Sequence, residues 1–416
     1  MIKRKSIQFL LIGWFTLCIF LTYTGYFHRL SPLGYLSVGI AGVLALQLVD
    51  EVRFFSFLPD LKVTFAFLIL LILGLLYTKA PIYGMQKIQV LGIYLVFFIL
   101  YSSTIAISFN LFVKFTIFWG IMYLGLLVAN FGDPYSYLVS TISRAARLGI
   151  NGDGDGAEFN PIWVARYLGH IFLFVFFYVW VERKFVVLNS ILLLMLFLYL
   201  IATGSKGPTI ALIAGLVVFL GQKNFSTYLK FVIPILFFGL FCFILLEQIN
   251  FFESKFFLNR FSAGTGSVSS RENFIGEAFS PSDSFAAIFG NGTGAFGYII
   301  NNRDTRFYPH NIFAEIFCEN GLLGVICFLV LLAQLWRVRG LIYNDVRVKL
   351  IFSLSIYYFL NAQTSGDLGA NQYFFFSYLL LFTMLRVVER ENKALENLEK
   401  QSDSTLVGIK NPVLSS

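Results

Sequence analysis

The chain of 416 residues has few charged side chains: Asp, Glu, Lys and Arg together make up 13%, against roughly 25% in soluble domains. Hydrophobic residues make up 57%. These shares exclude an ordinary soluble enzyme and a disordered chain. The formal net charge of +8 could indicate nucleic acid, but in so apolar a chain basic residues first mark one side of a membrane. We therefore expect no nucleic-acid partner.

Histidine and cysteine are also scarce, with three His and four Cys. No HxH, HxxxH or HExxH spacing occurs, and Cys and His never cluster, so we expect neither a metal centre nor another cofactor. The cysteines lie in apolar stretches, which excludes a disulfide framework and is typical of small core residues. They are Cys18, Cys242, Cys318 and Cys327.

Long apolar runs are the main feature of the sequence. A helix that crosses a membrane needs about 20 apolar residues, and twelve runs bounded by charge are candidates. The eighth and eleventh are short. The sequence therefore predicts an all-α, polytopic membrane helix bundle with about 12 transmembrane helices. The runs are 7–25, 33–49, 62–78, 88–107, 111–130, 165–181, 185–202, 208–221, 229–247, 311–336, 349–361 and 371–387.

The distribution of basic residues predicts the orientation. The first run follows Lys3, Arg4 and Lys5, so the N-terminus is expected in the cytoplasm, and the run's length argues against a cleaved signal peptide. Twelve crossings put both termini there, together with most Lys and Arg residues. Residues 1–388 would form one membrane domain with a large outer loop, about 248–310, containing short helices. The charged tail 389–416 is expected to be a short helix followed by disorder.

His310 is the most informative residue of that outer region. It stands where the loop enters the tenth run, and an imidazole there can accept a proton from a hydroxyl. The alternative is an interfacial side chain that reaches water. Glu319 lies two turns into the same apolar run, where an ionisable group indicates function by default; the alternative is a buried structural Glu. Gly321 and Gly324 favour close helix packing.

Basic residues on the outer side indicate an anionic ligand. Lys206 lies in a tight Thr-Gly-Ser-Lys-Gly turn, where it could bind phosphate or simply anchor the topology. The large loop carries Arg271, Arg303 and Arg306, and arginine binds phosphate through paired hydrogen bonds. Solvated loop arginines are the alternative, above all for Arg303 and Arg306.

Two motifs look like known binding loops. Residues 292–297 match GxGxxG, but without alternating strands and helices this match is weak, and a turn before a helix is the better interpretation. Residues 151–156 resemble the start of a calcium loop. The twelfth position is Ile162 rather than Glu, so that cage is incomplete.

The order of these motifs resembles the O-antigen ligase/polymerase superfamily of bacterial membrane glycosyltransferases. The resemblance is strongest over 200–335: the Lys206 turn, Ser-Arg at 270–271, the Gly-rich turn, and His-Asn at 310–311 opening a helix with Glu and two Gly. The Asn-Pro at 160–161 and Ala-Arg at 165–166 are also similar. The family usually has Arg where this chain has Lys206.

The resemblance implies a glycan donor on undecaprenyl diphosphate, presented at the periplasmic face of the bacterial inner membrane among its lipids. The acceptor would be a hydroxyl on lipid A–core for a ligase or on another lipid-linked glycan for a polymerase, with a chain-length regulator as a further partner. His310 would be the base, and Lys206 and Arg271 would hold the diphosphate without a metal. The supporting residues would be Asn311, Glu319, Arg303 and Arg166.

Three functions stay open from the sequence. Glycan transfer is favoured, with polymerase slightly ahead of ligase. A flippase or transporter for lipid-linked oligosaccharides is the alternative, although Lys and Arg are nearly absent from the centres of the runs and no inverted repeat is visible. A non-catalytic scaffold of envelope assembly is the third.

Overall fold

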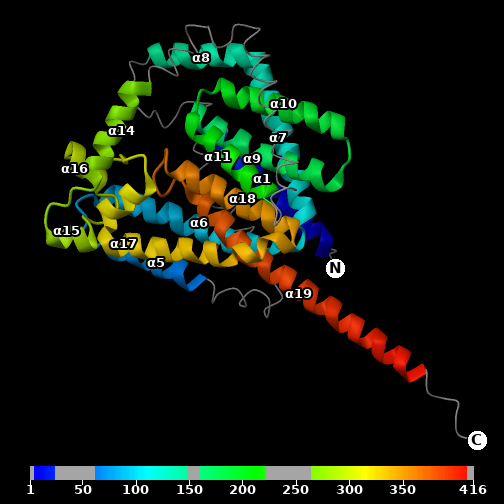
Figure 1. The fold of residues 1–416 in the computed structure, drawn as a ribbon. Coiled ribbons are helices and arrows are strands. Elements are labelled where there is room, and N and C mark those ends of the chain that lie inside the picture. Colours follow the sequence, from blue (N-terminus) through cyan, green and yellow to red (C-terminus); the bar gives the residue numbers. More distant parts are fainter. Residues whose placement is uncertain (1–3, 24–60, 148–159, 222–263, 410–416) are drawn as a thin grey trace, which may run out of the picture.

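The computed structural model describes residues 4–23, 61–147, 160–221 and 264–409, and every regular element in these ranges is a helix (Figure 1). This confirms the all-α class. The helices are α1 (Arg4–Tyr23), α5 (Lys62–Gly74), α6 (Pro81–Ile107), α7 (Phe109–Phe131), α8 (Pro134–Arg147), α9 (Pro161–Glu182), α10 (Val186–Ala202), α11 (Lys206–Leu220), α14 (Gly264–Ala278), α15 (Ser284–Phe289), α16 (Phe296–Asn301), α17 (Ile312–Arg337), α18 (Val346–Ala362) and α19 (Gln372–Ile409), with short 3-10 turns at Val338–Gly340 and Ile342–Asn344.

Five of these helices are long and apolar enough to cross a membrane, namely α1, α6, α7, α9 and α17. Ten of the twelve predicted runs coincide with helices; runs 33–49 and 229–247 and the calcium-like loop lie outside the described residues. The chain is thus a helical membrane protein, and the number of spans stays a prediction. One helix boundary differs from the predicted run, which began at residue 88. Helix α6 begins at Pro81, because Pro suits the first helical turn. Lys87 therefore lies inside the helix.

Aromatic side chains fill much of the core. The Phe15 ring lies 4.9 Å from the Tyr101 ring and 5.0 Å from the Phe376 ring, which joins α1, α6 and α19. Elsewhere small residues allow close approach: Gly169 of α9 lies against the Tyr357 ring of α18. Such contacts suit membrane helices, which associate by close packing rather than by the hydrophobic effect.

One end of the bundle collects the segments that matter below. In Figure 1 the short helices α15 and α16 lie at the same end as the start of α17, while the start of α1 and the end of α19 lie toward the opposite end. The described part of the large loop, 264–310, thus contains three helices, α14 to α16. The side of the membrane on which it stands remains a prediction.

The helical part of the C-terminal tail is longer than the short helix expected there. Helix α19 continues to Ile409 and projects from the bundle (Figure 1). Good helix formers explain this extension, and Glu389 and Lys393 are spaced four residues apart, so they can pair along one face. The Arg347 Nη2 atom also lies 2.6 Å from Glu391 Oε2, which ties the helix to α18.

Candidate functional site

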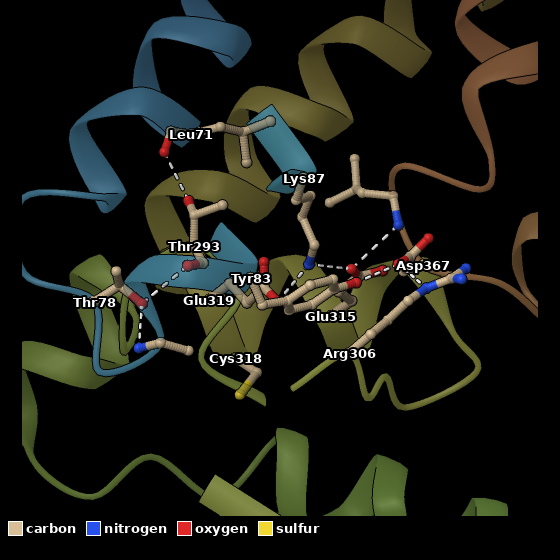
Figure 2. A network of polar contacts seen from close by, with 12 residues as sticks. Leu71, Thr78, Tyr83, Lys87, Thr293, Arg306, Glu315, Cys318, Glu319 and Asp367 are labelled. Carbon is tan, nitrogen blue, oxygen red and sulfur yellow. Dashed lines mark hydrogen bonds and ion pairs between the residues drawn. The ribbon is translucent and has the colours of Figure 1, made fainter. Parts of the chain in front are cut away.

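A buried ion cluster joins α6 to α17 (Figure 2). The Lys87 Nζ atom lies 2.6 Å from Glu315 Oε1 and 2.6 Å from Glu319 Oε1. The two carboxylates are four residues apart, so they share one face of α17. All three side chains are at most 1% exposed. Ionisable groups buried at this depth are costly unless they are paired, and here one lysine bridges two carboxyl groups.

Asp367, in the turn between α18 and α19, extends this cluster. Its Oδ2 accepts hydrogen bonds from the Tyr83 hydroxyl and, at 3.0 Å, from Arg306 Nε. The next residue donates its backbone N–H to Glu315 Oε1 at 3.1 Å. Burial raises the pKa of Asp367, but Arg306 and Lys87 more than offset this, so the pKa lies below the ordinary aspartate value. Three distant segments are therefore held together by charge.

The Gly-rich turn is the third part of this arrangement. Helix α17 is broken at Gly321, whose φ is 61°. The backbone N–H groups of Asn291 and Gly292 donate to the carbonyls of Cys318 and Glu319, each at 2.9 Å, just before that break. The Thr293 hydroxyl donates to Leu71 O at 2.7 Å (Figure 2). The prediction of a turn before a helix is confirmed, because α16 follows at Phe296.

His310 stands at the start of α17, with a positive φ of 59°. Its half-buried ring lies 4.6 Å from the Tyr308 ring in an edge-to-face arrangement. The next residue, Asn311, caps α17 by accepting the Ala314 N–H at 3.0 Å, and its side-chain amide donates to Gln363 Oε1 at 3.3 Å. The His-Asn pair is thus fixed against the α18–α19 turn.

Arg166 is buried beside the same turn, at 3% exposure. Its Nη2 atom donates to Asn361 O at 2.9 Å and to Ser365 O at 2.6 Å, and its guanidinium lies 5.3 Å from the Trp163 ring. Within the described residues no carboxylate forms a salt bridge with it, and its Nε has no hydrogen-bond acceptor. A buried cation balanced by carbonyl oxygens is a strong attractor for an anion.

Lys206 and Arg271 lie on two different helices, α11 and α14. Lys206 is exposed at the start of α11, and Gly207 beside it packs on Thr364 of the α18–α19 turn. Arg271 is half-buried on α14, where the Phe274 ring, one turn further on, lies 5.0 Å from the Phe307 ring. Both residues are therefore linked to the segments around His310 through their neighbours.

The other predicted site residues have different surroundings. Glu319 belongs to the ion cluster, whereas Arg303 is exposed in the loop before His310. Arg306 is also exposed, as the solvated alternative has it, and it pairs with Asp367 at the same time. Sequence reasoning also missed Lys87, Glu315, Asp367 and Tyr83. The sequence did contain a signal for a buried cluster, because charged side chains inside apolar runs need partners. It does not show which residues are those partners.

Within the described ranges, no three His, Cys, Asp or Glu side chains gather as a metal site would. The expectation of a mechanism without metal stays a prediction.

Comparison with known protein families gives one match. A family model described as O-antigen ligase matches residues 190–329, about a third of the chain. Residues 190–329 are similar to the O-antigen ligase family. The resemblance to the O-antigen ligase/polymerase superfamily is therefore confirmed. Neither a curated protein nor a solved structure matches the chain.

The matched range runs from α10 through most of α17 and includes Lys206, Arg271 and His310. The family implies glycan transfer by a membrane protein from a lipid-linked donor to an acceptor. Lys87 and Asp367 lie outside the matched range but contact it, through Glu315 and Arg306, whereas Arg166 lies outside it and bonds to the α18–α19 turn.

Proposed function

We propose that the protein transfers or polymerises glycan repeat units from undecaprenyl diphosphate onto an acceptor hydroxyl. The reaction takes place at the periplasmic face of the bacterial inner membrane, in surface-polysaccharide synthesis, with polymerase slightly favoured over ligase. One observation carries the proposal: the O-antigen ligase match contains two candidate cations and His310 in a single stretch. Packing through Thr364 and Phe307 supports their gathering at one end of the bundle.

The chemistry needs a base and a charge stabiliser. The acceptor hydroxyl gives its proton to the His310 imidazole while its oxygen attacks the anomeric carbon of the donor sugar. The bond between that carbon and the diphosphate oxygen breaks, and the polyprenyl diphosphate leaves with the bonding electron pair. Lys206 and Arg271 stabilise the negative charge that develops on it. His310 then releases its proton to water.

Arg166 supports an anionic donor on physical grounds. A guanidinium buried without a carboxylate is costly, and intramembrane charges that persist at such a cost usually bind a ligand. Its Nη2 is engaged by two carbonyls, but its Nε has no acceptor among the described residues. Arg166 also offers a compensation for Lys206, which keeps the charge of the family's usual Arg but lacks its two-pronged geometry.

A cellular experiment tests the proposal and separates its variants. The gene is deleted in its host, or replaced by His310→Ala with expression confirmed, and surface glycan is separated on a gel. A polymerase defect leaves a single repeat on the acceptor. A ligase defect leaves no glycan on the acceptor lipid, and lipid-linked chains accumulate. Donor stranded on the inner leaflet would indicate a flippase instead, and unchanged glycan in His310→Ala would refute the catalytic proposal.

A further inference from the structure

The backbone at His310 is held in a conformation that the chain does not favour by itself. Its φ of 59° lies in the left-handed region, which side chains with a Cβ rarely adopt, although His does so more often than most. Such residues persist where their surroundings determine their geometry, and they concentrate at functional sites. The question is therefore what fixes the chain on either side of His310.

Two ionic contacts flank this residue. Four residues before it, Arg306 Nε lies 3.0 Å from Asp367 Oδ2; five residues after it, Glu315 Oε1 lies 2.6 Å from Lys87 Nζ. Both contacts lead to α6, because the Tyr83 hydroxyl donates to Asp367 one turn from Lys87 (Figure 2). The loop before His310 and the helix after it are therefore fastened to one face of one helix.

The contacts that position the front of α17 must be made by residues 312–320 themselves. Since α17 is broken at Gly321, its rear half cannot set the direction of residues 312–320. Lys87 bonds to Glu315 and Glu319, one turn apart in this front segment, and so fixes its rotation as well as its position. Glu315 also accepts the Leu368 N–H at 3.1 Å, which ties in the turn that holds Asn311 through Gln363.

We propose that Lys87 is a positioning residue for His310: by bridging Glu315 and Glu319, it holds the first turns of α17 so that the imidazole is correctly placed. Lys87 does not touch substrate in this account. Its effect on catalysis rests on the proposed function, whereas its effect on the conformation of His310 does not.

Imidazole NMR tests the conformational part directly. The chain has only three histidines, so ring-¹⁵N labelling in detergent gives few signals, and the one lost in His310→Gln identifies His310. His170 is the internal reference, because it is buried in α9 and bonded to Tyr358 at 2.8 Å. Lys87→Met should shift or broaden the His310 signal and leave that of His170 in place, and Lys87→Arg should restore it. An unchanged His310 signal in Lys87→Met would overturn the proposal.

A second variant covers the case in which Lys87→Met does not fold. Glu319→Gln keeps the side-chain shape and leaves the Lys87–Glu315 contact in place. It should still move the His310 signal selectively, though by less. Equal movement of the His170 and His310 signals would indicate general loosening of the bundle and would also overturn the proposal.

Kinetics supply the catalytic part. With purified protein and undecaprenyl-diphosphate-linked glycan, Lys87→Met should lower kcat roughly 100-fold, as expected for a displaced catalytic group, while KM for the donor stays unchanged. Lys349→Met is the matched control: this lysine is also buried, but its Nζ atom lies 5.7 Å from the Phe219 and Tyr343 rings and takes no part in the Lys87 cluster. Full kcat in Lys87→Met would contradict the proposal. If the wild type transfers no glycan, the proposed function is wrong. The NMR result then still shows whether Lys87 positions His310.

Discussion

The Nη2 atom of Arg166 lies 2.6 Å from the carbonyl oxygen of Ser365, so α9 is bonded to the α18–α19 turn, which also accepts a hydrogen bond from Asn311. The same nitrogen also donates to Asn361 O at 2.9 Å, while Nε has no acceptor among the described residues. A lysine at this position would keep the charge but lose the planar guanidinium with its Nε. The contact therefore gives a clear prediction about the donor.

Arg166→Lys should raise KM for the lipid-diphosphate donor and lower kcat/KM about 10- to 100-fold. This range corresponds to the loss of one charged hydrogen bond, roughly 1.5–3 kcal/mol. Donor-concentration series with purified protein measure it. Arg337→Met, which removes an exposed arginine from the other end of α17, is the control and should change neither constant. A normal donor KM in Arg166→Lys would remove this residue from the anion site.

Gly292→Ala should destabilise the protein strongly. Its φ is 92°, and an added Cβ would collide with the backbone of Thr78, so the turn that pairs with the broken α17 cannot stay in place. Gly276→Ala is the matched control, because the added methyl group would meet open space on α14; it should be neutral or slightly stabilising. Thermal unfolding in detergent measures both. Equal melting temperatures would contradict the placement of the turn.

Asn311→Ala should cost about 1 kcal/mol of stability, because it removes the side-chain cap of α17. Asn311→Asp keeps an oxygen acceptor for the Ala314 N–H and should retain most of that stability. The two variants are compared by thermal unfolding. Equal losses in both would indicate that the hydrogen bond to Gln363, rather than the cap, is the important contact.

Asp367 should make stability depend on pH in the acid range. Its pKa in the folded protein lies below the ordinary value of about 3.9, so the folded state prefers the ionised form. The stabilisation is complete above the ordinary value and is lost as the pH falls through the lowered pKa. Melting temperatures of wild type and Asp367→Asn should therefore differ most near neutral pH and converge under strong acid. A difference that stays constant with pH would contradict the Arg306–Asp367 pair.

The sequence predicted the helices well because apolar runs bounded by charge are a local signal. Ten of the runs coincide with helices, and the Gly-rich segment was correctly interpreted as a turn. For the tail, the sequence predicted a short helix followed by disorder, and α19 continues as a helix to Ile409. Composition alone does not distinguish these two outcomes.

The ion cluster could not be predicted, since Lys87 and Glu315 are 228 positions apart and no periodicity links them. Glu319 was singled out because a carboxylate within an apolar helix stands out, but its partner lies in another helix. The positive φ of His310 was also invisible, because it depends on contacts that form only in the fold. Local patterns therefore gave the candidates, and the fold gave their pairing.

The central claim is that His310 acts as the base in glycan transfer, and the most direct measurement is the transfer rate of purified protein with a defined lipid-diphosphate donor and an acceptor. His310→Ala should lower kcat by about 10²- to 10⁴-fold, the range expected for loss of general base catalysis. His170→Gln, which alters a buried imidazole bonded to Tyr358, serves as the comparison and should retain most activity if folded. An unchanged transfer rate in His310→Ala would contradict the account.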